Sequence, residues 1–493
     1  MIPLPHSPQS LPPPRPPDFT DPPQVPATGR ASPPTTLAQK LVARACGRAH
    51  VEPGEIVTCR VDLAMFHDSS GPRRLKPMLE QLGATIWDKR RVVLVIDHYV
   101  PEADEESRRI VRLARDWAAE QALPHVHDSQ GICHVVVPQA GHIRPGMFCV
   151  GGDSHSPTGG AFGAYMFGIG ATEMLGVVVT GEIWLQVPQT MFLRWSGRLT
   201  EGVTAKDMML AMLGRFGMDG AQYQAVEYCG EAVRALPMAE RMTLCNMAAE
   251  LGAQVGLVAP DETTRQWLRQ AAQAMQATQA AAPGGMGTRS HDEPPCRPAR
   301  DSTDPVDAAT PLEALALEDC TRWRSDEGAP GRWHHFDASA LAPQIALPAS
   351  PANARAVGDL EPVRVDVAYI GACTGAKLED LRAAARVLAG QRVAAGVQLM
   401  VAPASVRDAR AAEAEGVMQV LREAGAQLLP SACGACAGYG GRIPEGSTVI
   451  SSTARNFKGR MGADTAQVFL GSPYTVAASA LRGWITDPRE VLA

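Results

Sequence analysis

Arg364-Val365-Asp366-Val367-Ala368-Tyr369-Ile370-Gly371-Ala372-Cys373-Thr374-Gly375 is the stretch that decides the fold of this chain. Residues 364–370 are typical of a buried β-strand, and a helical pattern begins soon afterwards at Leu378. Cys373 therefore lies in a tight loop that follows a strand. Open α/β sheets place their sites in loops at the carboxyl ends of strands, so we expect a site here.

A second loop with the same design carries two more cysteines. The sequence Ser431-Ala432-Cys433-Gly434-Ala435-Cys436-Ala437-Gly438 follows a short apolar run at 426–430. Small residues between Cys433 and Cys436 let the backbone fold tightly around a bulky inorganic group, and the two-residue spacing lets both thiolates face one metal centre. With Cys373 they make three thiolates without an obvious fourth. Such a set suggests an iron–sulfur cluster with one iron left open to bind substrate.

The cysteine spacing alone leaves other interpretations open. Buried free cysteines are common, and the two-residue spacing also occurs in zinc sites and in redox dithiols. The other eight cysteines have no comparable setting. We expect these eight to be core or surface thiols: Cys46, Cys59, Cys133, Cys149, Cys229, Cys245, Cys296 and Cys320.

Length and charge restrict the class of protein. A chain of 493 residues exceeds what one core usually holds, so we expect two to four domains. The net charge of −6 gives no indication of nucleic acid or of a membrane surface as a partner. No apolar run approaches the ~20 residues of a membrane helix, and the amino terminus lacks a secretory pattern. The eleven scattered cysteines fit a reducing compartment, so we expect a cytoplasmic protein.

The amino-terminal segment differs in composition from the rest of the chain. Residues 1–36 are rich in proline, which predicts a disordered tail, and helical spacing begins at Leu37. After the tail, apolar runs alternate with helical patterns, which indicates α/β layers. Runs at 92–96 and 134–137 predict buried strands, and 109–114 predicts a helix.

We expect three α/β domains after the tail. Their predicted ranges are 37–190, 191–350 and 351–493. The stretch 277–311 is rich in Ala, Gly, Pro and Asp without a clear period, so it predicts a flexible insertion in the second domain.

Polar residues follow three of the apolar runs in the first region. Asp153, Ser154 and His155 lie together in the Gly-flanked turn 151–160, where glycine lets backbone approach a ligand. A purely structural turn is the alternative. The pairs Asp97-His98 and His67-Asp68 also end apolar runs. Each pair alone is an ordinary surface or capping contact, but two of them suggest a shared polar rim.

Two further sets of polar residues are candidates for binding. Arg455 and Arg460 lie five apart in a Gly- and Ser-rich stretch, and their fork-shaped guanidinium groups suit carboxylate substrates. The alternative is a solvated basic loop. Asn246 and Glu250 lie four apart and are expected to share one helix face, with a solvent-facing pair as the alternative.

With these motifs assembled, the chain from about Thr36 to Ala493, apart from the insertion, resembles the aconitase superfamily. Within it, the motifs are most similar to those of the large subunits of 3-isopropylmalate dehydratases, enzymes of leucine biosynthesis. The family's Cys-Thr-Asn and Cys-x-x-Cys loops match residues 373–375 and 433–436, so the resemblance implies a [4Fe-4S] cluster. The implied fold is three α/β/α domains of the aconitase type packed around that cluster.

The resemblance also implies roles for individual residues. Cluster ligands would be Cys373, Cys433 and Cys436. Catalytic residues would be Asp97, His98, Asp153, His155 and Glu250. Substrate-binding residues would be His67, Ser154, Asn246, Arg455 and Arg460.

Two departures from the family pattern bear on the substrate. The family usually has Asn after Cys-Thr, where this chain has Gly375, and Asn before the first Arg of the Arg-Asn-Phe motif, where it has Ala454. Both amides could bond a carboxylate or hydroxyl. We therefore expect a small dicarboxylate or tricarboxylate substrate, with dimethylmalate, methylmalate and homoaconitate as alternatives to 3-isopropylmalate.

The carboxyl terminus suggests a partner. The chain ends at Ala493, soon after the Arg-Asn-Phe motif, and the resemblance implies that the swivelling fourth domain with the catalytic base comes from a separate small subunit in a heterodimer. The expected reaction is reversible dehydration or isomerisation of a substituted malate. Two rival classes are an iron-sensing RNA binder, which the acidic charge disfavours, and a zinc-binding α/β protein.

Overall fold

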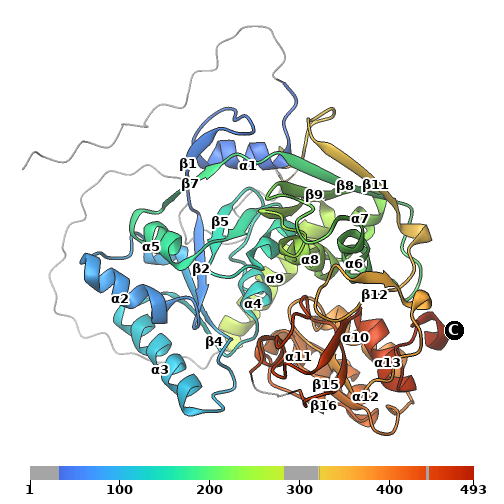
Figure 1. Ribbon diagram of the computed structural model, residues 1–493. Coiled ribbons are helices and arrows are strands. Elements are labelled where there is room, and N and C mark those ends of the chain that lie inside the picture. The colour runs from blue at the N-terminus through green and yellow to red at the C-terminus, as the bar shows by residue number, and fades with distance from the viewer. Residues whose placement is uncertain (1–32, 282–319, 321, 440–442, 493) are drawn as a thin grey trace, which may run out of the picture. The chain divides into compact units, whose positions relative to one another are not determined.

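The computed structural model describes residues 33–281, 320, 322–439 and 443–492, and Figure 1 shows how their elements are arranged. Residues Pro34–Ala493 form one compact unit. Its described strands form three main sheets and one two-stranded ribbon, and helices connect many of the successive strands. The α/β fold class predicted from the sequence is confirmed.

The first sheet has five parallel strands in the order β4-β3-β2-β5-β6. Every residue of its strand β3 is buried, because side chains of alternating direction enter two different cores. Val93 and Val95 join one core, whereas Val92, Leu94 and Ile96 join the other. Both faces of the sheet are therefore covered, as parallel sheets require.

The strands of this sheet are β2 (Leu63–His67), β3 (Val92–Ile96), β4 (His125–Asp128), β5 (Phe148–Gly151) and β6 (Tyr165–Gly168). The helices of the same part of the chain are α1 (Leu37–Ala45), α2 (Pro72–Leu82), α3 (Glu105–Glu120), α4 (Cys133–Gln139) and α5 (Ala171–Thr180). The antiparallel ribbon pairs β1 (Ile56–Arg60) with β7 (Glu182–Gln186).

The second sheet has four parallel strands in the order β10-β9-β8-β11. These strands are β8 (Thr190–Ser196), β9 (Ala225–Cys229), β10 (Val255–Val258) and β11 (Arg332–Asp337). The helices of this part are α6 (Ala205–Phe216), α7 (Glu231–Ala235), α8 (Met238–Asn246) and α9 (Glu262–Ala281).

The third sheet has seven strands in the order β13-β12-β18-β17-β14-β15-β16. They are β12 (Gln344–Ala346), β13 (Ala354–Ala356), β14 (Val367–Ile370), β15 (Gln398–Val401), β16 (Gln427–Leu428), β17 (Thr448–Ser451) and β18 (Gln467–Leu470). The five strands from β18 to β16 are parallel. The helices are α10 (Leu378–Leu388), α11 (Val406–Ala414), α12 (Val417–Glu423), α13 (Pro473–Arg482) and α14 (Arg489–Leu492).

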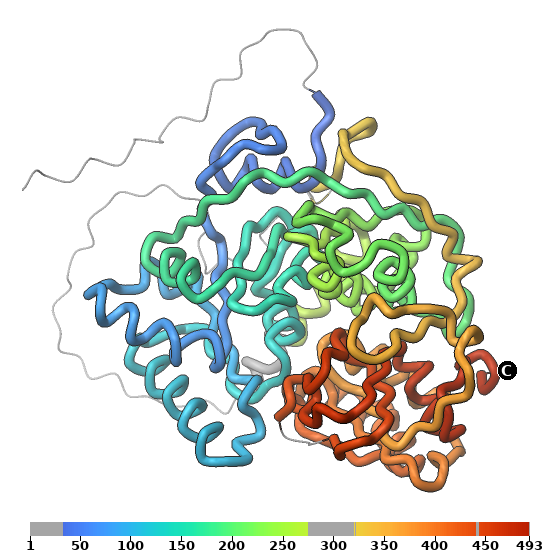
Figure 2. Tube along the Cα trace, viewed as in Figure 1, coloured from blue at the N-terminus to red at the C-terminus, as the bar shows by residue number. Residues whose placement is uncertain are grey.

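One hydrophobic core joins all three sheets. It includes Met65 of the first sheet, Leu193 of the second and Tyr369 of the third. Figure 2 follows the chain by colour from the blue and cyan elements of the first sheet to the red elements of the third. We retain the division into domains at 37–190, 191–350 and 351–493 as a proposal. None of the described helices is long and apolar enough to cross a membrane.

The strand expected at 134–137 is wrong, because Cys133–Gln139 forms helix α4. A short apolar run does not distinguish a strand from a buried helical turn. Here the Cys133 N–H at the start of the helix donates to the Asp97 carboxylate at 2.7 Å. A carboxylate at this position satisfies a free N–H and interacts favourably with the helix dipole, so it favours a helix beginning there.

The limits of the expected tail and insertion also change. Thr36 caps α1, and the Thr35 N–H donates to Asp326 at 2.9 Å, so both belong to the folded unit. The expected tail from residue 1 to 32 lies outside the described residues. Helix α9 includes residues 277–281 of the expected insertion, and residues 282–311 lie outside the described part.

Candidate active site

The carboxyl ends of three neighbouring strands bring the first group of predicted residues together. His67 ends β2, Asp97 and His98 follow β3, and Asp153 lies two residues after β5. Because β3, β2 and β5 are parallel neighbours, these ends share one edge of the sheet. The His67 and His98 rings stack there with their centroids 3.7 Å apart.

Asp97 and His98 form a buried ion pair. The Asp97 Oδ1 lies 2.7 Å from His98 Nδ1, and its Oδ2 accepts from the Cys133 N–H. Burial disfavours the imidazolium, but the charge and hydrogen bond of Asp97 outweigh it and raise the pKa of His98 to about 10. Asp68 fixes the turn by accepting from the backbone N–H groups of His98 and Tyr99. His98 therefore carries a proton at neutral pH, with Nε2 left to act as a donor.

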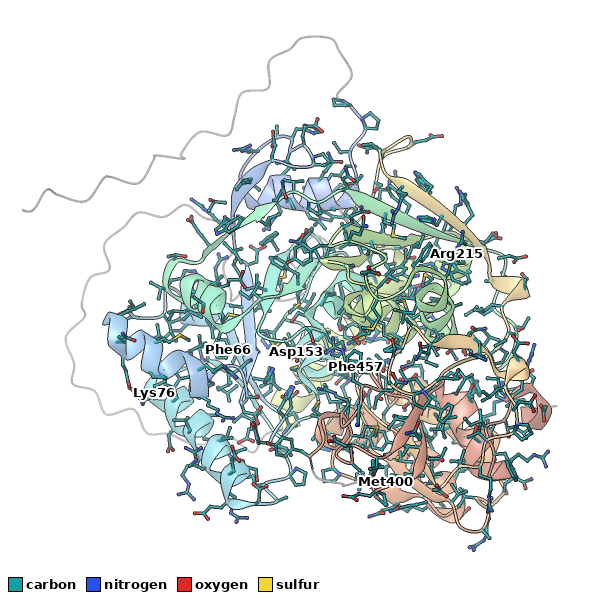
Figure 3. All side chains as sticks on the ribbon, viewed as in Figure 1. Phe66, Lys76, Asp153, Arg215, Met400 and Phe457 are labelled. Atoms are coloured by element: carbon teal, nitrogen blue, oxygen red, sulfur yellow. The ribbon has the colours of Figure 1, made fainter. Side chains whose placement is uncertain are left out.

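Asp153 is the centre of a second charged group. Its Oδ1 lies 2.7 Å from His134 Nε2 and accepts from the His155 N–H at 2.8 Å. Burial opposes ionisation, yet the His134 and His155 rings hold the pKa of Asp153 well below its usual range. The Asp153 Oδ2 also lies 3.7 Å from His67 Nε2 and 3.8 Å from His98 Nε2. Figure 3 places Asp153 near the centre of the view, where elements of the first sheet approach the carboxyl-terminal part.

Glu250 links the second sheet to the third. Its Oε1 lies 3.0 Å from His155 Nε2 and accepts from Arg455 Nε at 2.6 Å. Burial opposes both charges, but the contacts raise the pKa of His155 to about 9 and lower the pKa of Glu250 to about 2. The three charges therefore persist through neutral pH. Arg455 follows β17 at the carboxyl edge of the third sheet, so it is held in place by a protein carboxylate.

Asn246 and Glu250 do not share one α-helix as expected. Helix α8 ends at Asn246, and a 3₁₀ turn at Met247–Ala249 separates the two residues. The solvent-facing alternative is also wrong, since both side chains are buried. Asn246 Nδ2 donates to Thr158 Oγ1 at 2.8 Å and to Cys373 Sγ at 3.2 Å. Asn246 is therefore in direct contact with a predicted cluster ligand.

The three predicted cysteine ligands line one pocket. Cys373 follows β14, and Cys433 and Cys436 follow β16, so both loops leave the same edge of the third sheet. All three thiols are buried and free of disulfides. His98, Asp153, His155 and Arg460 complete the polar lining, with His134 beside them. The carboxyl edges of the first and third sheets thus meet in one pocket.

The three thiols differ in acidity. Burial and the neighbouring Cys436 raise the pKa of Cys373 to about 12. The pKa of Cys433 is well above its usual range, first because of its hydrogen bond with Cys436. That bond, together with Arg460 and His155, lowers the pKa of Cys436 to about 6 against the effect of burial. One thiolate is therefore already favoured, and the other two need a stronger positive partner.

Several buried polar atoms of this site have no hydrogen-bond partner among the described residues. They are His67 Nε2, Asn246 Oδ1, Glu250 Oε2 and Arg460 Nε. Because the Ser69 N–H donates to His67 Nδ1, the proton of that ring is assigned to Nε2. Buried groups of this kind normally bond to something, so the site is built to receive a polar ligand.

Ser154 is a predicted site residue that the structure does not place in the pocket. It lies on the same turn as Asp153 and His155, but its side chain is exposed and does not line the pocket. Its role in substrate binding remains a prediction.

Steric crowding explains why residue 375 is a glycine in this structure. A Cβ on Gly375 would lie 2.3 Å from both the Cβ and the Oγ of Ser452. An Asn side chain at this position would force Ser452 to move. Ala454, the second departure from the family pattern, lines the pocket.

Two groups of His and Asp side chains are close enough to hold a metal ion. They are His67, Asp68, Asp97 and His98, and His134, Asp153 and His155. In both groups the carboxylates already bond to imidazole nitrogens, and the raised pKa values of His98 and His155 keep those rings protonated. A protonated imidazole does not ligate a metal, so the cysteines are the better metal-binding set.

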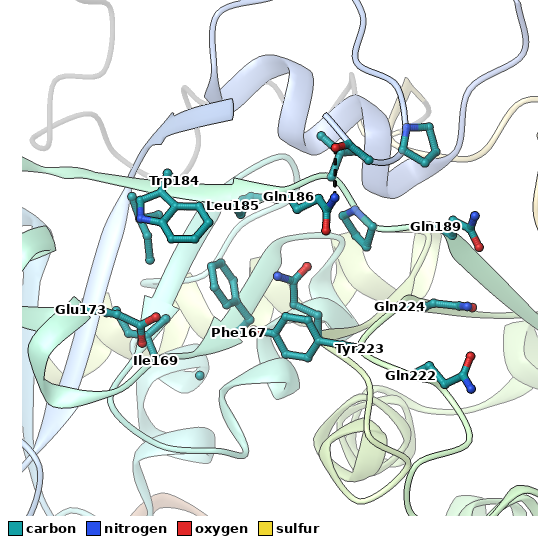
Figure 4. Close-up of a pocket in the computed structure, with 17 residues that line it drawn as sticks. Phe167, Ile169, Glu173, Trp184, Leu185, Gln186, Gln189, Gln222, Tyr223 and Gln224 are labelled. Atoms are coloured by element: carbon teal, nitrogen blue, oxygen red, sulfur yellow. Dashed lines mark hydrogen bonds between the residues drawn. The ribbon is translucent and has the colours of Figure 1, made fainter. Parts of the chain in front are cut away.

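A larger pocket lies beneath β7, and Figure 4 shows it. Its lining includes five glutamines together with Trp184 and Tyr223, and its ionisable residues are Glu173 and Tyr223. It has neither a cysteine nor a histidine. Despite its size, it lacks paired acids and bases, so we place the chemistry at the cysteine pocket.

Sequence reasoning missed two residues that the structure brings into the site. His134 bonds Asp153, but the expected strand concealed it, since it was treated as part of an apolar run. Thr158 accepts from Asn246 and lies on the same Gly-flanked turn as Asp153. The proximity of Thr158 to Asp-Ser-His was an available signal, whereas His134 had none in its local sequence.

Comparisons with known proteins agree with this geometry. The aconitase family (aconitate hydratase) profile matches residues 39–294 and 356–483. The chain is 39% identical over 460 residues to the 3-isopropylmalate dehydratase large subunit 1 of Methanopyrus kandleri, covering 93% of this chain and 99% of the relative.

Two further relatives have similar identity to this chain, and the second of them has a different name. The 3-isopropylmalate dehydratase large subunit of Moorella thermoacetica is 36% identical, covering 93% of this chain and 99% of the relative. The probable methanogen homoaconitase large subunit of Methanosarcina mazei is 38% identical, covering 87% and 99%. The family match spans most of the chain and includes both cysteine loops. The chain therefore belongs to the aconitase family, and it is a hydro-lyase.

Proposed function

We propose that the chain is the cluster-bearing large subunit of a [4Fe-4S] hydro-lyase that reversibly dehydrates or isomerises a substituted malate. The enzyme that it would resemble most is 3-isopropylmalate dehydratase. The observation that supports this best is the pairing of two sheet edges in one pocket. Cys373, Cys433 and Cys436 form one wall, and His98 and Asp153 belong to the other. Sulfur ligands and proton donors thus face the same small space.

The residues present fit a cluster. The three thiols are buried, free and within one pocket, and Asn246 already donates to Cys373 Sγ. Hydrogen bonds to sulfur are a normal feature around such clusters. Zinc prefers four protein ligands in structural sites, and the imidazoles near these thiols are protonated or bonded to carboxylates. Three thiolates without a fourth protein ligand suit a cluster with one open iron.

When bound, the cluster supplies a Lewis-acidic iron that polarises the substrate C–OH bond. The remaining steps depend on the chain's own residues. Asp97 holds the His98 ring through Nδ1, so that the Nε2 proton is available to a leaving hydroxyl. Asp153 orients the His134 ring through its Nε2 and accepts from the His155 N–H, so it fixes the imidazoles beside the pocket.

Two arginines are suited to hold the substrate carboxylates. Arg460 lines the pocket, and its Nε has no partner among the described residues. Arg455 is oriented by Glu250, which in turn contacts His155. A guanidinium fixed in this way binds a carboxylate without first losing rotational freedom.

We further propose that a separate small subunit completes the site. Relatives of nearly the same length are named large subunits. The partner would supply the base that removes the proton from the neighbouring carbon. A homoaconitase activity is the second candidate, since relatives at similar identity carry that name. We place the enzyme in the cytoplasm, in line with its cysteine usage.

The test is an anaerobic assay of the chain with and without the small subunit encoded beside it. The substrates are 3-isopropylmalate, dimethylmalate, methylmalate and homoaconitate. The readout is alkene formation for the three malates and alkene loss by hydration for homoaconitate. We expect turnover only with the partner and fastest with 3-isopropylmalate. Preference for homoaconitate would favour the second candidate. Absence of turnover with every substrate by a cluster-loaded complex would overturn the proposal.

A further inference from the structure

Lys206 is a buried cation behind the cysteine pocket. It is the second residue of α6, whose cap Thr204 fixes the start of the helix. Its side chain is 1% exposed, although lysine is almost never fully buried without a partner. It lies outside the pocket lining, so it does not face the substrate directly.

The Nζ of Lys206 connects two loops of the third sheet. It donates to Thr374 Oγ1 at 3.4 Å, next to the ligand Cys373. It also donates to the carbonyl oxygens of Ser452 and Thr453, at 3.1 and 2.5 Å. These carbonyls precede Ala454 and Arg455. One side chain therefore ties the first cysteine loop to the arginine loop.

The charge of Lys206 has no direct ion-pair partner among the described residues. In the described part of the chain, no Asp or Glu oxygen forms an ion pair with its Nζ. Lys377, the second buried lysine at this loop, differs: it bonds the carbonyl of Cys373 at 3.0 Å and pairs with Asp380 at 2.8 Å. An unpaired buried charge is costly, so Lys206 requires a compensating negative charge.

The groups that act on Lys206 show where that charge comes from. Burial lowers its pKa to about 8, while Glu250, Cys373 and Cys436 act in the opposite direction. Glu250 is already shared between His155 and Arg455. The remaining groups that could supply the compensating charge are Cys373 and Cys436. Without a cluster only Cys436 favours the thiolate, whereas a cluster held by three thiolates spreads net negative charge over all three ligands.

We propose that Lys206 is the fixed buried counter-charge of the cluster and a positioning residue for its first cysteine loop. This inference rests on the proposed function. A nearby positive charge favours the more reduced state of a cluster, so Lys206 raises its reduction potential. The same charge strengthens cluster retention. A simple hydrogen-bonding role would hold the loops but leave the potential unchanged.

The test compares Lys206→Gln, which keeps a donor but loses the charge, with Lys206→Arg, which keeps the charge. Measurements are the cluster reduction potential, the rate of iron release to a chelator, and Tm with and without the cluster. We expect Lys206→Gln to shift the potential to more negative values and to release iron several-fold faster. The Tm of the cluster-free form serves as a check on folding, since the substitution removes both a buried charge and the hydrogen bonds of Nζ. Lys206→Arg should restore the potential toward the wild-type value.

The control is Lys40→Gln, which removes a lysine paired with the exposed Asp326 and should change none of these readouts. A wild-type potential and iron-release rate in Lys206→Gln would overturn the inference while leaving the proposed function intact. If the cluster-free Gln variant does not fold, Lys206→Met replaces it with the same expectations. A wild-type chain that binds no cluster would overturn both proposals.

Discussion

The carboxyl edge of the first sheet and that of the third sheet meet at one pocket. The polar side chains at these two edges differ in how fully other protein groups pair with them. At the first edge, Asp97 bonds His98 and Asp153 bonds His134, each at 2.7 Å. At the third edge, Cys373 and Cys433 have raised pKa values, and Arg460 Nε lacks a partner among the described residues.

This difference separates the preorganised groups from those that await a ligand. The charges of the acid–base edge are fixed by protein partners, so they are in place before anything binds. At the sulfur edge only Cys436 favours the thiolate, whereas the raised pKa values of Cys373 and Cys433 keep these thiols neutral until a strongly positive group binds. The two edges should therefore respond differently to mutation.

The largest effect is expected at the sulfur edge. Serine at Cys373, Cys433 or Cys436 should abolish cluster assembly and all turnover, because a cluster with three protein ligands cannot readily spare one. Iron and sulfide analysis of each variant checks this. The control is Cys245→Ser, a buried thiol outside the pocket, which should keep its iron. Full iron in any ligand variant would remove that cysteine from the set.

A smaller effect is expected at the acid–base edge. Asp97→Asn should leave the cluster in place but lower kcat by ~10²–10⁴-fold, since it removes the charge that keeps His98 protonated. In the wild type the raised pKa keeps His98 charged until the pH approaches about 10, so this group limits activity only at alkaline pH. In the variant, Asp153 and Asp68 still favour the charged ring, but the larger contribution of Asp97 is lost and the pKa of His98 falls, so the alkaline limb of the pH–rate profile should move toward acid. An unshifted profile would contradict the role given to His98.

A weaker effect on activity is expected from Arg455, which connects the two edges through Glu250 and His155. Arg455→Lys keeps the charge but loses the Nε donor to Glu250, so kcat/KM should fall by about 10–100-fold, in line with one hydrogen bond to a charged group. Arg382→Lys is the matched control: Arg382 also bonds a glutamate, Glu415, but both are exposed. Exposed pairs contribute little. Equal behaviour of the two variants would mean that Arg455 does not serve the site.

The smallest effect is expected from the tail. Deletion of residues 2–33 should leave Tm and activity unchanged, because the hydrogen bonds at the start of the folded unit begin at Thr35. The comparison is deletion of residues 2–36, which also removes the Thr36 cap and should lower Tm. A large loss of stability from the shorter deletion would show that the tail contributes to the fold.

Much of the site could be predicted because its residues share one local signal. Cys373, Asp97 and Asp153 each come directly after an apolar strand, and parallel neighbouring strands bring the residues at their carboxyl ends to one edge of the sheet. Sequence alone could not show that the edges of two different sheets face each other. That depends on the common core, which joins Met65 to Tyr369 across the chain.

Two of the residues that were missed, His134 and Lys206, lack any local signal. His134 lies in a run of valines that predicts a strand, yet the Asp97 carboxylate at its amino end favours a helix, and that contact is distant in sequence. Lys206 resembles an ordinary solvated lysine at the start of a helix. Its burial depends on loops more than 160 residues away, whose hydrogen bonds it completes.

The presence of a cluster is tested most directly by metal and sulfide analysis of the anaerobically purified chain, combined with optical and EPR spectra. We expect about four iron and four sulfide per chain, with an iron–sulfur spectrum that changes when substrate is added, since one iron remains open to it. One zinc per chain without sulfide, or a spectrum that substrate leaves unchanged, would contradict the proposed cluster and its role.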